Sequence, residues 1–201
     1  MNLKQFRKGL KQLGSWRQFA FLLALAERGY PNFALFADIV DGAHRTRFRE
    51  LLDTAWSMLE RKDHGQDVFR LLTRLESVQP DPEAHDFYGV IPALNAWQLL
   101  EQAFLCHVNE DKERCEPGAQ LAMDTVVSFV EMTEGEGLDE DALVRLLDDN
   151  ELVEIEQNFQ QMLVKELQGC RKPSPGFIDH IRGMAANRGV SNLGLEADSG
   201  A

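Results

Sequence analysis

Residues 15–36, SWRQFAFLLALAERGYPNFALF, are the most apolar stretch of this 201-residue chain. The eight residues from Phe19 to Ala26 carry no polar side chain. Charged residues stand too close on both sides for the roughly 18 apolar residues that a membrane-spanning helix requires. In a water-soluble protein, a helix that is apolar on nearly every side is covered all round by its neighbours. The stretch therefore predicts the buried central helix of a bundle.

The two ends of this helix are marked by typical capping residues. Ser15, with Gln18 three residues further on, has the spacing of a capping box, which predicts that a helix begins here. Gly29 is a typical residue just beyond a helix end, and Pro31 favours a stop at the same place. The sequence thus predicts a central helix over residues 16–28, followed by a separate short segment.

The rest of the chain has helical periodicity in almost every segment and no sustained alternation of period two. Apolar residues recur at helical spacing in the ranges 3–13, 48–59, 68–78, 92–107, 117–130, 139–147, 152–167 and 177–187. We expect an all-α, single-domain bundle of about eight to nine helices around the central one. The helical domain is expected to span residues 1–190, and residues 191–201 to form a loose tail.

Composition places the chain among ordinary globular proteins, with 44% hydrophobic and 27% charged residues. Its formal net charge of −12 argues against broad binding to nucleic-acid backbones. The charge is unevenly placed, because residues 1–26 hold five basic residues and no acid, whereas residues 131–156 hold eleven acids and only Arg145. This layout permits steering of a basic partner, or docking of the basic end onto the acidic segment within one chain or between subunits.

The cellular location is indicated by the cysteines and the N-terminus. Three cysteines without a Cys-x-x-Cys pair do not form a disulfide framework. The first residues lack the apolar region of a secretory signal. We therefore expect a cytoplasmic protein with reduced thiols and no membrane association.

Four segments resemble, in the same order, segments of the YjaG-like family of uncharacterised small acidic bacterial proteins. They are SWRQFAFLLALAERGYPNFALF, DFYGVIPALNA, EMTEGEGLDED and SNLGL. The resemblance covers nearly the whole chain, which supports homology rather than a shared local motif. It implies a compact, all-helical, cytoplasmic bacterial protein. Because the family is uncharacterised, it assigns no catalytic role to any residue here.

Motifs of known chemistry are absent from the sequence. The histidines and cysteines are scattered, with no His-Glu-x-x-His motif. The acidic stretch 131–142 does not follow the order of an EF-hand loop, and a solvated loop with Asp139 as a helix cap explains it more simply. Neither a Gly-x-Ser-x-Gly elbow nor a phosphate-binding loop occurs. We therefore expect no metal and no cofactor, and the catalytic residues of any enzyme remain unknown.

Candidate binding residues cluster where a loop enters a helix, at residues 86–92, because loops often carry binding side chains. A hydrophobic staple that covers nearby aromatic residues explains this segment more simply, with Asp86 as a cap. His107 falls on an apolar helix face, where a structural role is the simpler interpretation. The candidate binding residues are Asp86, Tyr88, His85 and His107.

Three function classes stay open at this point. The favoured hypothesis is a non-enzymatic protein-interaction module whose partner is another protein or a second copy in a homodimer. The first alternative is an enzyme or small-ligand-binding protein whose site is assembled from distant helices. The second alternative is an acidic protein that imitates nucleic acid or acts as an immunity protein against a basic effector, suggested by residues 131–156.

Overall fold

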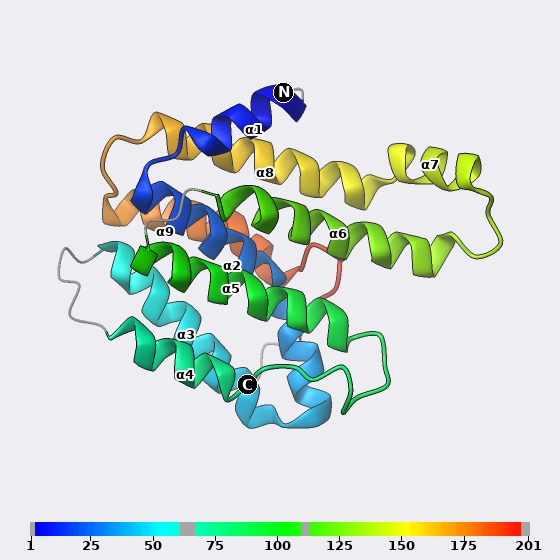
Figure 1. Cartoon of the computed structure of the whole chain (residues 1–201), viewed down its shortest axis with the longest axis horizontal. Coiled ribbons are helices and arrows are strands. Elements are labelled where there is room, and N and C mark those ends of the chain that lie inside the picture. Colours follow the sequence, from blue (N-terminus) through cyan, green and yellow to red (C-terminus); the bar gives the residue numbers. More distant parts are fainter. Residues whose placement is uncertain (1–2, 61–66, 110–112, 198–201) are drawn as a thin grey trace.

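The chain folds into helices, and the longest loop that the structure describes, residues 77–89, joins α4 to α5 (Figure 1). The computed structural model describes residues 3–60, 67–109 and 113–197. Within these ranges there are nine α-helices and no strand, only an isolated antiparallel bridge between Val190 and Glu196. The helices are α1 Leu3–Lys11, α2 Ser15–Val40, α3 Gly42–Glu60, α4 Val68–Glu76, α5 Val90–Asn109, α6 Cys115–Glu134, α7 Glu140–Asp149, α8 Glu151–Gly169 and α9 Pro175–Ala186. The predicted all-α fold is confirmed.

Helix α2 lies at the centre, as its apolar sequence predicts. Every residue from Phe19 to Ala26 is at most 2% exposed. The neighbours that cover it are α3, α5, α6, α8 and α9, and α5 makes the most extensive contact. Burying apolar side chains on all sides of one helix is the main driving force for this arrangement.

The predicted end of this helix at Gly29 is wrong, because α2 continues to Val40. A Cβ atom on Gly29 would lie 3.0 Å from the Cβ of Ala96, so this glycine permits close packing of α2 against α5. Pro31 removes one helical hydrogen-bond donor but does not end the helix. The following turns bury Phe33 and Phe36, which outweighs that loss. Figure 1 shows that the axis of α2 bends in its second half.

The start of α2 also differs from the prediction by one residue. The N-cap position belongs to Gly14, and no side chain forms a capping hydrogen bond there. Ser15 is the first helical residue.

Helices α6 and α8 run side by side and extend away from the central body, with α7 at their far end (Figure 1). A small second core holds this extension together. Val126 and Val130 of α6 meet Leu193, and Leu146 and Leu147 of α7 pack against them. Residues 131–155 form the far end of this extension, and we call them the acidic arm.

The basic first helix docks onto its own chain. Gly9 of α1 packs against Val164 of α8, and the Nε2 atom of Gln168 donates to the Gly9 carbonyl. Arg7 forms an ion pair with Glu116, at 2.9 Å, at the start of α6. The docking therefore uses the first turn of α6 and the second half of α8, and not the acidic arm.

The segment after α9 is packed where the sequence predicts a loose tail. Ser191, Asn192 and Leu193 are buried. The Oδ1 atom of Asn192 accepts a hydrogen bond from Nδ2 of Asn32, at 2.9 Å. A hydrogen bond between two buried side chains fixes this segment against α2. The last residues of the predicted tail, 198–201, lie outside the described ranges.

Candidate functional site

Two adjacent charges, Glu27 and Arg28, stand in the buried middle of α2. Successive residues of an α-helix point about 100° apart, so the two side chains reach different neighbours. A buried charge is tolerated when it is paired and hydrogen-bonded. Each of these two charges therefore needs a partner on a neighbouring helix.

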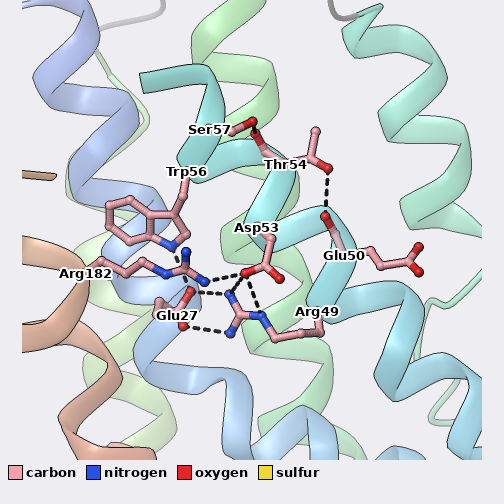
Figure 2. Close-up of polar contacts among 8 residues, drawn as sticks. All are labelled: Glu27, Arg49, Glu50, Asp53, Thr54, Trp56, Ser57 and Arg182. Atoms are coloured by element: carbon pink, nitrogen blue, oxygen red, sulfur yellow. Dashed lines mark hydrogen bonds and ion pairs between the residues drawn. The ribbon is translucent and has the colours of Figure 1, made fainter. Parts of the chain in front are cut away.

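Glu27 is the centre of a network that joins α2 to α3 (Figure 2). Its two carboxylate oxygens accept from the guanidinium of Arg49, both at 2.7 Å, and one also accepts from Nε1 of Trp56 at 2.7 Å. Burial alone lowers the pKa of Arg49, but hydrogen bonding and attraction to Glu27 and Asp53 raise that pKa by more. The network thus keeps Arg49 charged.

The same network reaches α9 through Asp53. This carboxylate accepts from Arg49 and forms an ion pair with Arg182, whose guanidinium also lies over the ring of Trp56 (Figure 2). Two arginines therefore face two carboxylates, and the charges balance. Such a network fixes α2, α3 and α9 relative to each other and offers no free acid, base or nucleophile.

Arg28 points to the other side of α2 and pairs with Glu156 of α8 at 2.8 Å. The Glu156 side chain is 0% exposed, and its second oxygen accepts from Gln160, which also donates to the carbonyl of Ala119 in α6. Burial raises the pKa of Glu156 above its ordinary value, against the attraction of Arg28 and the hydrogen bond from Gln160. This chain of contacts ties α2, α8 and α6 together.

Three of the four candidate residues lie in the loop before α5. The rings of His85 and Phe87 pack against Phe36, and Tyr88 contacts Phe129 of α6. Burial raises the pKa of Tyr88. Asp86 is exposed. The aromatic residues of this loop therefore cover the second half of α2 and the neighbouring α6.

Trp97, by contrast, is covered by α4. Its Nε1 donates to the carbonyl of Leu75 at 2.8 Å.

His107, the fourth candidate, lies at the other end of α5 against the ring of Phe19, with 4.9 Å between the ring centroids. At about 1.5 Å per residue, the 17 residues from Val90 to His107 span roughly 25 Å. The structure thus does not bring His107 together with His85 and Tyr88. A binding role for any of the four stays a prediction.

The acidic arm is the largest concentration of one charge on the molecule. Ten of the eleven acids in residues 131–156 are exposed, and the eleventh is Glu156. None of the ten forms an ion pair with a residue that the structure describes. The ten exposed acids are Glu131, Glu134, Glu136, Asp139, Glu140, Asp141, Asp148, Asp149, Glu151 and Glu154.

Helix α7 presents these charges from a defined scaffold. The side chain of Asp139 caps its start, and Asn150 both follows its end and caps α8. Asp141 and Asp148 are two turns apart and share the side opposite Leu146 and Leu147. Beside them Val144 is 53% exposed. The outer side of α7 therefore combines acidic and aliphatic groups.

Two grooves border the helices described above. An open one of about 780 Å³ lies within the arm and is lined by Glu134, Leu138, Asp149 and Glu151, among others. Another, of about 240 Å³, lies between α1, α6 and α8 and is lined by apolar side chains, four glutamines and the ion-paired Arg7 and Glu116. Among the described residues, no three His, Cys, Asp or Glu side chains converge to hold a metal ion. In the same ranges, no helix has both the length and the apolar character needed to cross a bilayer.

Sequence reasoning missed the networks of Glu27 and Arg28. It used both residues only as boundaries of the apolar run. The signal that identifies them is their position in the middle of a helix that is otherwise apolar all round, since such charges must have buried partners. The identity of those partners, Arg49 and Glu156, depends on the packing of distant helices.

A family model described as "Protein of unknown function (DUF416)" matches residues 5–196. An uncharacterized protein of Haemophilus influenzae is 29% identical over 191 residues, which cover 94% of this chain and 95% of that protein. The uncharacterized protein YjaG of Escherichia coli is 30% identical, with 92% and 93% covered. A crystal structure of a DUF416 family protein from Shewanella baltica matches with a TM-score of 0.85 and 25% identity, over 98% of this chain and 100% of that one.

Proposed function

The chain belongs to the DUF416 family of proteins of unknown function, and from this premise we propose that it is a non-enzymatic protein-interaction module. Its working surface is the acidic arm, and its partner is a protein with a basic surface. We place this activity in the cytoplasm, where three cysteines remain reduced.

The observation that carries this proposal is the absence of ion pairs from the ten exposed acids of the arm, among the residues described. Like charges held close together on one surface repel each other, and a basic partner removes that repulsion. Complementary charge also speeds association and excludes acidic competitors. The exposed side chains of Val144 and Leu138 add apolar contact area within the same surface.

The buried charges support a non-enzymatic role. Glu27 and Glu156 are both in ion pairs with arginines, and their oxygens are further occupied by Trp56 and Gln160. A general base or nucleophile needs a lone pair that faces a substrate. Both carboxylates are buried and hydrogen-bonded to these partners, so neither faces a substrate.

The test is affinity capture from the cytoplasm of the native bacterium with an arm variant, Asp141→Asn/Asp148→Asn. The matched control is Glu83→Gln/Asp179→Asn, which removes two exposed charges outside the arm. We expect the arm variant to lose, in quantitative mass spectrometry, a protein with a basic surface that the wild type and the control both retain. Equal recovery by all three would remove the basis of the proposal.

The groove between α1, α6 and α8 favours a second candidate, a small-ligand-binding protein. Its volume of about 240 Å³ is lined by Phe6 and Met123 on its apolar side and by Gln157 and Gln160 on its polar side. Small-ligand sites combine apolar walls with a few polar groups in this way. Mass spectrometry of small molecules released from the purified protein tests it. A bound molecule that disappears in Met123→Trp, which fills the groove, would favour this candidate.

A further inference from the structure

The basic residues of α1 fall into two groups. Arg7 pairs with Glu116, and Phe6 and Leu10 face the body of the protein. Lys4 and Lys8 are on the opposite side of the helix and are exposed. Neither lysine forms an ion pair with a residue in the described ranges. Because α1 is held by other side chains, these two lysines are available to a partner.

The outer side of α7 carries the opposite charge. Asp141 and Asp148 are exposed and likewise without an ion pair among the described residues. The two helices are similar in length, with nine residues in α1 and ten in α7. Each also carries one exposed aliphatic side chain, Leu3 at 61% and Val144 at 53%.

The two rows do not meet within one chain. Leu3 and Gln157 line the same groove, so α1 reaches along α8 only as far as this point. Seven residues, or roughly 10 Å of helix, separate Gln157 from Asn150, where α7 has already ended. In the described parts of the chain, the ion pairs of α1 go to Glu116 and not to the arm.

We propose that the acidic arm of one copy receives α1 of a second copy, and that the second copy returns the same contact in a twofold-symmetric dimer. Reciprocal contacts of this kind close the assembly and pair Lys4 and Lys8 of each copy with Asp141 and Asp148 of the other. This inference rests on the proposed function, because it names the basic partner of the arm as Lys4 and Lys8 of a second chain.

The experiment is sedimentation velocity of the full chain with two charge-reversal variants, Lys4→Glu/Lys8→Glu and Asp141→Lys/Asp148→Lys. The wild type is expected to be a dimer at low salt and to dissociate in about 1 M salt, where screening acts over about 3 Å. Each variant alone juxtaposes like charges, which raises the dissociation constant at least about 100-fold. The control Arg47→Glu/Arg70→Glu makes the same change of charge on α3 and α4 and should remain dimeric.

Mixing the two variants distinguishes a lost contact from a damaged fold. In the mixed dimer both contacts again pair opposite charges, so a heterodimer should form, and the fourfold variant in a single chain should dimerise with itself. A wild type that is monomeric at low salt, or reversed variants that do not recover on mixing, would overturn the inference. If the wild type is monomeric but the arm still captures a basic protein, the inference fails and the proposed function stands.

Discussion

At the scale of single residues, the stability of this protein depends on charges placed inside an apolar helix. Arg28 and Glu156 are almost fully withdrawn from water, and they form an ion pair with each other at 2.8 Å. Desolvation makes such a pair of little net benefit compared with apolar residues of similar size. Removing one member is far more damaging, because the other is left buried and unpaired.

We expect Arg28→Met to lower the free energy of unfolding by about 3–5 kcal/mol. The double variant Arg28→Met/Glu156→Leu should recover much of this loss, since it removes both charges. Urea unfolding of the wild type and the two variants measures these differences. A double variant as unstable as the single one would contradict the assignment of the loss to an unpaired charge.

The raised pKa of Glu156 predicts a pH dependence. A folded-state pKa above the ordinary value of 4.5 means that the folded protein binds this proton more tightly than the unfolded chain. The contribution of Glu156 to stability is therefore greatest at low pH and declines as the pH rises from 4.5 through the raised pKa.

The measurement is the difference in unfolding free energy between the wild type and Glu156→Gln at a series of pH values from about 4 to 7. The unfolding free energy of the wild type, relative to that of Glu156→Gln, should decrease as the pH rises. The exposed Glu154→Gln serves as the control and should run parallel to the wild type. If this relative unfolding free energy instead increases with pH, the pairing with Arg28 outweighs burial.

At the scale of the helices, the close contact between α2 and α5 organises the body. Gly29 lacks a side chain where Ala96 approaches, and this allows the two backbones to pack closely. A larger residue cannot be accommodated by a flexible neighbour, because the nearest atom is the Cβ of Ala96, fixed to the backbone of α5. The sequence signal that suggested a helix end was therefore a packing signal.

We predict that Gly29→Leu destabilises the protein by at least about 2 kcal/mol, as is usual for overpacking in a core. Gly183→Leu is the matched control, because a Cβ at Gly183 in α9 meets nothing within 4 Å. The control should be neutral or stabilising, since it replaces a helical glycine. The measurement is the melting temperature of both variants in thermal unfolding. Equal melting temperatures would mean that α2 and α5 are not tightly packed at Gly29.

At the scale of the whole molecule, the sequence predicted what depends on local patterns. The apolar run of residues 19–26 indicated a central helix, and the cap at Asp139 was predicted from its residue type. The break at Pro31 was wrong, because burial of the next two turns overrides a local signal. The packing of residues 191–193 was missed, because it depends on Asn32, about 160 positions away.

For the candidate sites too, local features could be predicted from the sequence, and features that depend on distant packing could not. The concentration of acids in residues 131–156 was visible in the sequence, but their exposure and the exception of Glu156 were not. Periodicity shows which face of a helix is apolar, and it does not show which distant helix covers that face. The loop residues and His107 could not be placed relative to each other for that reason.

The central claim is that the acidic arm is the surface through which this protein binds a basic partner. Zero-length carbodiimide cross-linking, which joins a carboxylate to a lysine in direct contact, tests it most directly when applied to intact cells. We expect mass spectrometry to find intermolecular links concentrated at Asp141 and Asp148. Such links should be absent from exposed acids such as Glu83 and Asp179. Links spread evenly over all exposed acids, or found only outside residues 131–155, would contradict it.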